Sequence, residues 1–150
     1  MFEDRICEKV ELCQNGMNPF LIHEFANTFF VVGDHQFYKG YSLLLYKKHV
    51  REFHELSLEQ HAELSVELYL ANKAVANTYA PWKMNNQCLG NQDQHIHWHI
   101  LPRYESDKYH KSYPFTDCMK GEVELSDYLI SGEEAKVVAA KIRANLLDLI

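Results

Sequence analysis

Polar and apolar residues alternate strictly along one stretch of the chain. Three histidines are interleaved there with three large apolar residues: His95, Ile96, His97, Trp98, His99 and Ile100. Successive side chains of a β-strand point to opposite faces, so a strand here places all three imidazoles on one face. A helix would spread them around its circumference. Burial of the apolar face contributes about 2 kcal/mol for each large side chain. The pattern predicts a strand that ends at Pro102, which has no N–H to donate.

Four other segments have the aromatic, β-branched or alternating composition that is typical of strands. They are residues 20–25, 27–32, 41–46 and 82–88. The second and third are predicted to pair in antiparallel fashion, joined by the loop Asp34–Gly40. Residues 5–13 alternate only weakly and are predicted to be a short strand or turn. Together with the histidine strand, these segments indicate an antiparallel sheet of about five strands.

Two helices are predicted from capping boxes that precede apolar residues at helical spacing. The capping pairs are Ser57 with Gln60 and Ser131 with Glu134. The first helix is expected over residues 57–77 and the second over residues 131–149. Residues 104–130 show no period and are predicted to be a long loop. Antiparallel strands, interrupted by one long helix and closed by another, favour an α+β fold in a single domain over residues 1–150.

Composition narrows the classes of function. The chain is 47% hydrophobic and 24% charged, as is usual for a globular domain, and its net charge of −6 argues against a nucleic-acid surface. No apolar run approaches the roughly 20 residues that cross a membrane. Residues 1–5 lack the basic start of a signal peptide. We therefore expect a cytoplasmic protein without a membrane partner. Its four cysteines are expected to be reduced thiols in packing roles.

A row of three imidazoles suits two kinds of chemistry. Imidazole is a common ligand of zinc, so the three histidines could together bind a metal ion. Alternatively, the middle histidine could act as a nucleophile while its neighbours orient it and bind substrate charge. The residues alone leave both interpretations open.

Residues 95–101 resemble the signature of the histidine-triad (HIT) family, in which three histidines alternate with apolar residues and two apolar residues follow. The resemblance extends to the loop Asp34–Gly40 and to Gly90, and covers about residues 5–104. The loop and helix at residues 105–150 lie outside it. Within the family, the chain looks like bacterial dinucleoside polyphosphate hydrolases. A uridylyltransferase branch has Gln at the third position, whereas this chain has His99, which favours the hydrolase side.

The resemblance implies a nucleotide hydrolase or nucleotidyl transferase that acts at an α-phosphate. His97 would attack the phosphorus and form a nucleotidyl-imidazole intermediate, which water then cleaves. His99 would bind a non-bridging phosphate oxygen, and His95 would help to fix the tautomer of His97. The family precedent also implies a homodimer, and neither a cofactor nor a protein-bound metal is required for this chemistry.

The same resemblance suggests which residues bind substrate. Asp34 would accept hydrogen bonds from the ribose hydroxyls. Gly90 would allow the backbone to approach the phosphate, while Asn91 and Gln92 would contact the phosphate or the leaving group. Asn85 lies near the position of a further phosphate ligand in the family. The chain departs from the family pattern at two positions: Gln92 replaces a hydroxyl residue, and Tyr41 replaces a fourth histidine.

Two other interpretations differ in kind from an enzyme of this class. One is a zinc site built from the three histidines, and the other is a module that binds nucleotides without catalysis. The presence of His97 argues against the second, because a binding module needs no nucleophile. The sequence does not specify the base, the number of phosphates or the leaving group.

Overall fold

A computed structural model describes residues 4–150 of the chain. Its centre is an antiparallel sheet of five strands, as predicted, and the strand order is β1-β2-β3-β5-β4. The strands are β1 (Leu21–Glu24), β2 (Thr28–Val32), β3 (Ser42–Tyr46), β4 (Lys83–Gln87) and β5 (His97–Arg103). β2 and β3 form the expected antiparallel pair. β5 lies between β3 and β4, so its backbone is hydrogen-bonded on both sides.

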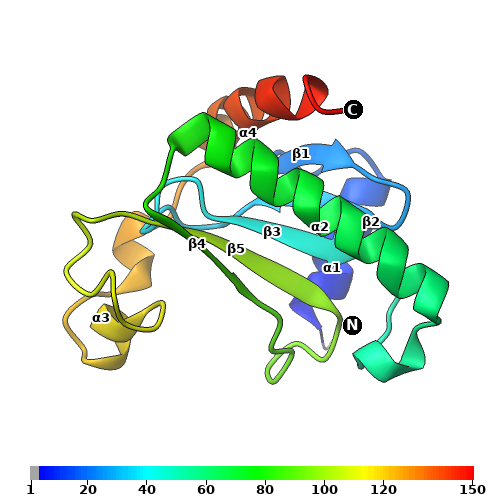
Figure 1. Cartoon of the computed structure of the whole chain (residues 1–150), viewed down its shortest axis with the longest axis horizontal. Coiled ribbons are helices and arrows are strands. Elements are labelled where there is room, and N and C mark those ends of the chain that lie inside the picture. Colours follow the sequence, from blue (N-terminus) through cyan, green and yellow to red (C-terminus); the bar gives the residue numbers. More distant parts are fainter. Residues whose placement is uncertain (1–3) are drawn as a thin grey trace.

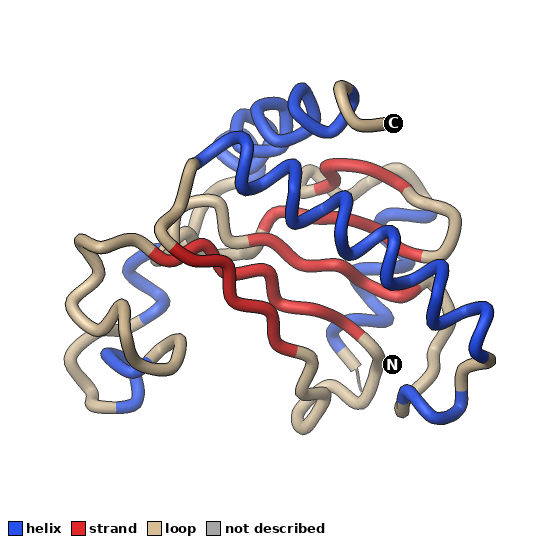
Figure 2. Tube along the Cα trace, in the orientation of Figure 1, coloured by secondary structure: helices blue, strands red, loops and turns tan. Residues whose placement is uncertain are grey.

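Helices cover both faces of the sheet (Figure 1). The two predicted helices, α2 (Leu58–Tyr79) and α4 (Gly132–Leu147), pack together on one face, and each begins with the expected capping box. Helix α1 (Arg5–Gln14) lies on the opposite face. The fold is therefore α+β, with one core beneath α2 and α4 and a second beneath α1. Figure 2 shows the same layers by type of secondary structure.

The prediction of a strand or turn at residues 5–13 was wrong, because this segment forms α1. Asp4 caps the helix by accepting hydrogen bonds from two backbone N–H groups. Ile6, Val10 and Cys13 are the buried positions, spaced four and three residues apart. That spacing is the helical period, and the weak alternation obscured it.

The predicted end of the histidine strand at Pro102 was also wrong, since β5 continues to Arg103. Pro102 pairs with Met84 of β4, whereas the pairing with β3 reaches only Ile100. Pro102 therefore lies where β5 has a single neighbouring strand, a position that tolerates a missing N–H. His95 and Ile96 precede the strand proper, but Ile96, Trp98 and Ile100 all pack into the core beneath α2, as predicted.

Residues 104–130 are mostly loop, as predicted, with two short helical turns, α3 (Thr116–Met119) and η2 (Leu125–Tyr128). The segment returns to the loop that carries Asp34. Leu129 forms an isolated bridge with His35, and the N–H of Ile130 donates to the carbonyl of Asp34 at 3.0 Å. The loop between β2 and β3 is thus held by the C-terminal part of the chain.

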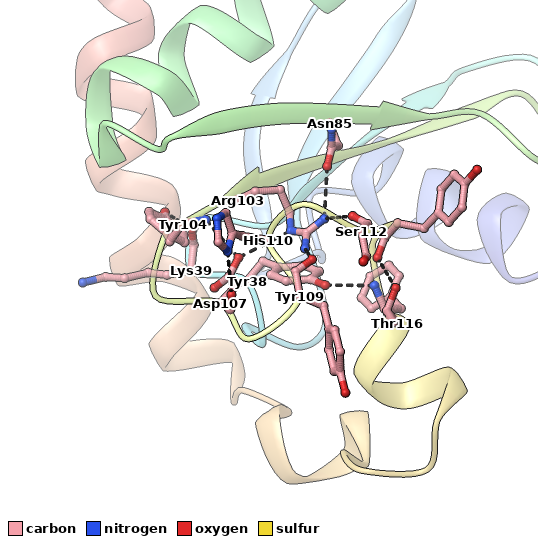
Figure 3. Close-up of polar contacts among 12 residues, drawn as sticks. Tyr38, Lys39, Asn85, Arg103, Tyr104, Asp107, Tyr109, His110, Ser112 and Thr116 are labelled. Carbon is pink, nitrogen blue, oxygen red and sulfur yellow. Dashed lines mark hydrogen bonds and ion pairs between the residues drawn. The ribbon is translucent and has the colours of Figure 1, made fainter.

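Arg103 fixes the start of this segment (Figure 3). Its side chain is fully buried, and its guanidinium lies 4.7 Å from the centre of the Tyr38 ring. It donates to the backbone carbonyls of Tyr109 at 2.8 Å and Ser112 at 3.1 Å. It also contacts the carboxylate of Asp107. A buried guanidinium needs several acceptors, and here the loop supplies most of them.

No helix within residues 4–150 is both long and apolar enough to span a membrane.

Candidate active site

A cavity of about 500 Å³ opens on the face of the sheet that carries α1. Six of the predicted site residues line it together: Asp34, Gly90, Asn91, Gln92, His97 and His99. Two predicted residues do not line it. His95 is buried beside α1, and the Asn85 side chain accepts a hydrogen bond from Arg103 at 3.2 Å (Figure 3). The structure thus gives Asn85 a protein partner outside the cavity.

His97 is held by a backbone carbonyl. Its Nδ1 lies 2.6 Å from the carbonyl oxygen of His95. A carbonyl oxygen can only accept, so Nδ1 carries the proton and donates it. The unprotonated nitrogen of the neutral ring is therefore Nε2, whose lone pair is free to attack an electrophile. The contact with His97 is made by the backbone of His95 rather than by its ring.

His99 lies beside His97, with 5.0 Å between the ring centres. Burial, together with the neighbouring His97, lowers the pKa of His99 to about 4. His99 is therefore neutral at pH 7. Its Nδ1 is 2.7 Å from the hydroxyl of Tyr41, the residue that departs from the family pattern.

The loop that carries Gly90, Asn91 and Gln92 is tied to α1. Arg5 contacts Asp93 at 2.8 Å and donates to Gln92 Oε1 at 3.3 Å. Burial alone would raise the pKa of Asp93, but the hydrogen bonds from Arg5 outweigh it and hold the pKa below its usual value. Gly90 has a φ of 67°, a left-handed conformation that glycine adopts without strain. The backbone of this loop is thus fixed beside His97.

Asp34 has a charged partner that sequence analysis did not identify. Its Oδ1 lies 2.6 Å from Lys9 Nζ, and the Asp34 side chain remains half exposed at the cavity wall. Lys9 belongs to α1, a segment that was predicted to be a strand or turn. The ion pair between Lys9 and Asp34 was therefore not predicted. One side of the carboxylate remains accessible to a ligand.

Several other residues of the cavity wall were not among the predicted site residues, although Tyr41 was noted as a departure from the family pattern. They are Arg5, Ile6, Lys9, His35, Tyr41, Leu43, Leu89, Asp93 and Leu125. The first three come from α1, and a helical period at residues 6, 10 and 13 was the signal that could have placed them. Leu125 comes from the predicted loop, whose return to the site depends on tertiary contacts that no local pattern encodes.

Comparison with known proteins agrees with this geometry. A family model described as the HIT domain matches residues 16–106. The chain belongs to the HIT family. Among curated proteins, none matches this chain significantly.

Solved structures of HIT proteins share the fold. A hypothetical histidine triad nucleotide-binding protein from Sulfolobus tokodaii is 17% identical, with a TM-score of 0.72, and the alignment covers 95% of this chain and 93% of that one. A zinc-bound histidine triad protein from Mycobacterium smegmatis is 20% identical, with a TM-score of 0.68 and coverage of 97% and 94%. Plasmodium falciparum diadenosine triphosphate hydrolase is 14% identical, with a TM-score of 0.65 and coverage of 87% and 78%.

A second cluster of polar groups lies behind the cavity of this HIT protein. Asp4, Cys7, His49 and His95 each bring one ligand atom to within 4.8 Å of the others. His95 Nε2 donates to the carbonyl of Tyr46 at 2.6 Å, which leaves the lone pair of its Nδ1 facing Cys7 Sγ at 3.4 Å. Cys7 therefore faces imidazoles and does not have the packing role that was predicted for it.

This donor set fits a zinc ion. It offers the nitrogen, sulfur and oxygen ligands of a tetrahedral site, and Asp4 Oδ2 is buried without a hydrogen-bond partner among residues 4–150. Burial raises the pKa of the Cys7 thiol, and Asp4 raises it further, so a metal would displace the thiol proton on binding. The zinc site considered from sequence used all three triad histidines, whereas this set includes only His95.

We expect the metal-free protein to bind one zinc ion at this cluster. A ligand that binds only the folded state at about a hundred times its Kd stabilises that state by about 2.7 kcal/mol. Zinc should therefore raise the melting temperature, and Cys7→Ala should abolish both the bound zinc and the shift. Cys118→Ala, which removes a thiol elsewhere, should change neither. Equal zinc content in the Cys7→Ala and unmodified proteins would contradict the assignment.

Proposed function

We propose that this HIT protein cleaves a phosphoanhydride or phosphoramidate at the α-phosphate of a nucleotide through a nucleotidyl-imidazole on His97. The observation that carries the proposal is the fixed tautomer of His97 in the wall of the cavity, with Nδ1 held by a carbonyl and Nε2 unprotonated. The Plasmodium falciparum relative, a diadenosine triphosphate hydrolase, supports dinucleoside polyphosphates as one substrate class.

The proposed reaction has two displacements at phosphorus. His97 Nε2 attacks the α-phosphorus and forms a P–N bond, while the bond to the leaving group breaks and its electron pair departs with that group. Water then attacks the same phosphorus, the P–N bond breaks, and the electron pair returns to Nε2. The water releases one proton to the solvent in this step, and an amine leaving group takes one proton from the solvent in the first step. Covalent catalysis divides one difficult displacement into two easier ones.

The other groups of the cavity would bind the phosphate. His99 is neutral at pH 7 because burial lowers its pKa, so its ring can offer an N–H to a non-bridging oxygen. The backbone around Gly90 and the amides of Asn91 and Gln92 would contact the phosphate or the leaving group, while Arg5 adds a positive charge beside Gln92. Such donors assist most when they are held in place before the reaction.

We expect His97→Ala to abolish turnover and to leave nucleotide affinity largely intact, because binding relies on the other groups of the cavity. Rapid quenching into mild base, with substrate labelled at the α-phosphate, should leave label on the unmodified protein, and acid should release it. Cys88→Ser should retain the label and His97→Ala should not. His54→Ala removes an exposed imidazole and should have no effect on turnover.

Three results would contradict the proposed mechanism. One is turnover by His97→Ala within about tenfold of the unmodified protein. Another is a tight nucleotide complex with no turnover of any substrate tested, which would favour a binding module. The third is inversion at a chiral α-phosphorothioate, because two in-line displacements retain configuration and a single attack by water inverts it.

Asp34 is proposed to bind the ribose. Its carboxylate can accept from two hydroxyls, and Lys9 at 2.6 Å holds it at the cavity wall. We expect Asp34→Ala to weaken ribonucleotide binding by about 1.5–3 kcal/mol, the contribution of hydrogen bonds to a charged group. Deoxyribonucleotides should lose less. Isothermal titration with both sugars measures the difference, and equal losses would mean that Asp34 only shapes its loop.

A homodimer is proposed from the family resemblance and from the surface beside α2. β4 is an edge strand of the sheet. A groove between α2 and β5 is lined by Phe53, Leu68 and Trp98, and Tyr69 of α2 is 63% exposed. An open edge beside exposed apolar groups is typical of a protein interface.

We expect sedimentation equilibrium to give a dimer. Tyr69→Glu should weaken it, because a charge would be buried in the interface. Leu147→Glu changes an exposed apolar residue of α4 and should leave the assembly unchanged. A monomer at every concentration tested would contradict the proposal.

A further inference from the structure

Tyr41 is built into the site with a geometry that the family pattern does not explain. Its side chain is buried immediately before β3, and its hydroxyl lies 2.7 Å from His99 Nδ1. The two rings are almost parallel, with 7° between their planes. A separation of 2.7 Å is the usual length of a hydrogen bond to a hydroxyl, so the phenol and Nδ1 are hydrogen-bonded.

The direction of this hydrogen bond follows from the surroundings of the phenol. A hydroxyl that accepted from Nδ1–H would leave its own proton without an acceptor, and no other partner of the Tyr41 hydroxyl is found among residues 4–150. Burial raises the pKa of Tyr41 far above its usual value, so the phenol keeps its proton. The hydroxyl therefore donates to Nδ1, and the neutral His99 ring carries its proton on Nε2.

Neighbouring residues pack closely around the Tyr41 ring. A side-chain carbon added at Gly33 would collide with the Tyr41 ring. His35 stacks on the same ring with 4.7 Å between centres, and Phe115 approaches it edge-on at 6.3 Å. Phe115 comes from the C-terminal segment, outside the matched family domain. Contacts from two distant parts of the chain thus restrict how the phenol can move.

From these contacts we propose that Tyr41 is a positioning residue, which keeps His99 in the tautomer that presents its Nε2–H to a ligand phosphate. The inference rests on the proposed function for the role of His99 toward phosphate. The tautomer itself is a property of the protein without ligand. The phenol provides the orienting hydrogen bond at the position where, by the family resemblance, a fourth histidine would stand.

The first test needs no substrate, and it uses a variant only to assign the His99 signals. Nitrogen NMR of the histidine rings at pH 7 should show His99 with a protonated Nε2 and an unprotonated Nδ1, and the His99→Ala variant identifies its signals. A protonated Nδ1 in the unmodified protein would overturn the inference, whatever the enzyme does.

The second test separates positioning from simple packing. Tyr41→Phe should give a mixture of His99 tautomers and reduce kcat by about tenfold, as expected for the loss of one orienting hydrogen bond. In the His99→Ala background, Tyr41→Phe should change kcat by less than about twofold, because its effect passes through His99. Equal effects in both backgrounds, or an unchanged tautomer, would overturn the inference.

Tyr38→Phe is the matched control. It removes a buried phenol hydroxyl that accepts from the N–H of Phe115 at 2.8 Å and has no contact with His99. It should leave the His99 tautomer unchanged. If no nucleotide is turned over by the unmodified protein, the proposed function fails, but the tautomer measurements still decide the role of Tyr41.

Discussion

Side chains of β5 must alternate between the two faces of the sheet, and both the core and the candidate site depend on that alternation. Ile96, Trp98 and Ile100 pack beneath α2, while His97 and His99 line the cavity on the other face. Pairing with β3 and β4 fixes the strand from both sides. A shift of one residue would exchange the two faces, exposing the apolar side chains and burying the imidazoles in the core.

Each imidazole of the triad has one nitrogen engaged by a nearby oxygen. A carbonyl of Tyr46 holds His95, a carbonyl of His95 holds His97, and a phenol holds His99. One sequence motif therefore produces three chemically different groups. His95 offers a lone pair to the cluster with Cys7. Under the proposed function, His97 keeps a lone pair for attack and His99 offers a proton.

The main part of the fold could be predicted from local patterns. The strands and the two capping boxes depend on neighbouring residues, so the sequence of each segment was sufficient. Helix α1 was missed because its buried positions are few and its weak alternation imitates a strand. The place of Asn85 also could not be predicted, since it depends on Arg103, which is buried only when residues 104–112 fold over it.

Six of the predicted site residues line one cavity, but most of the other residues of its wall were not predicted. The triad follows from a local alternation of residues, whereas Asp34 and the loop at Gly90 were predicted from the family resemblance. The ion pairs of Lys9 with Asp34 and of Arg5 with Asp93 join α1 to distant parts of the chain. A pair separated by 88 positions in sequence, such as the second, leaves no local signal. Long-range contacts of this kind position the groups that the motif supplies.

The bridge between His35 and Leu129 has a consequence for how relatives should be compared. The matched family domain ends at residue 106, yet Leu125 forms part of the cavity wall and Ile130 is hydrogen-bonded to the backbone of Asp34. The boundary of the family is therefore not the boundary of the binding pocket. Two members that align well over the shared domain, but differ in the segment that follows it, would have pockets of different shape. Their preferences for ligand would then diverge without any change in the triad.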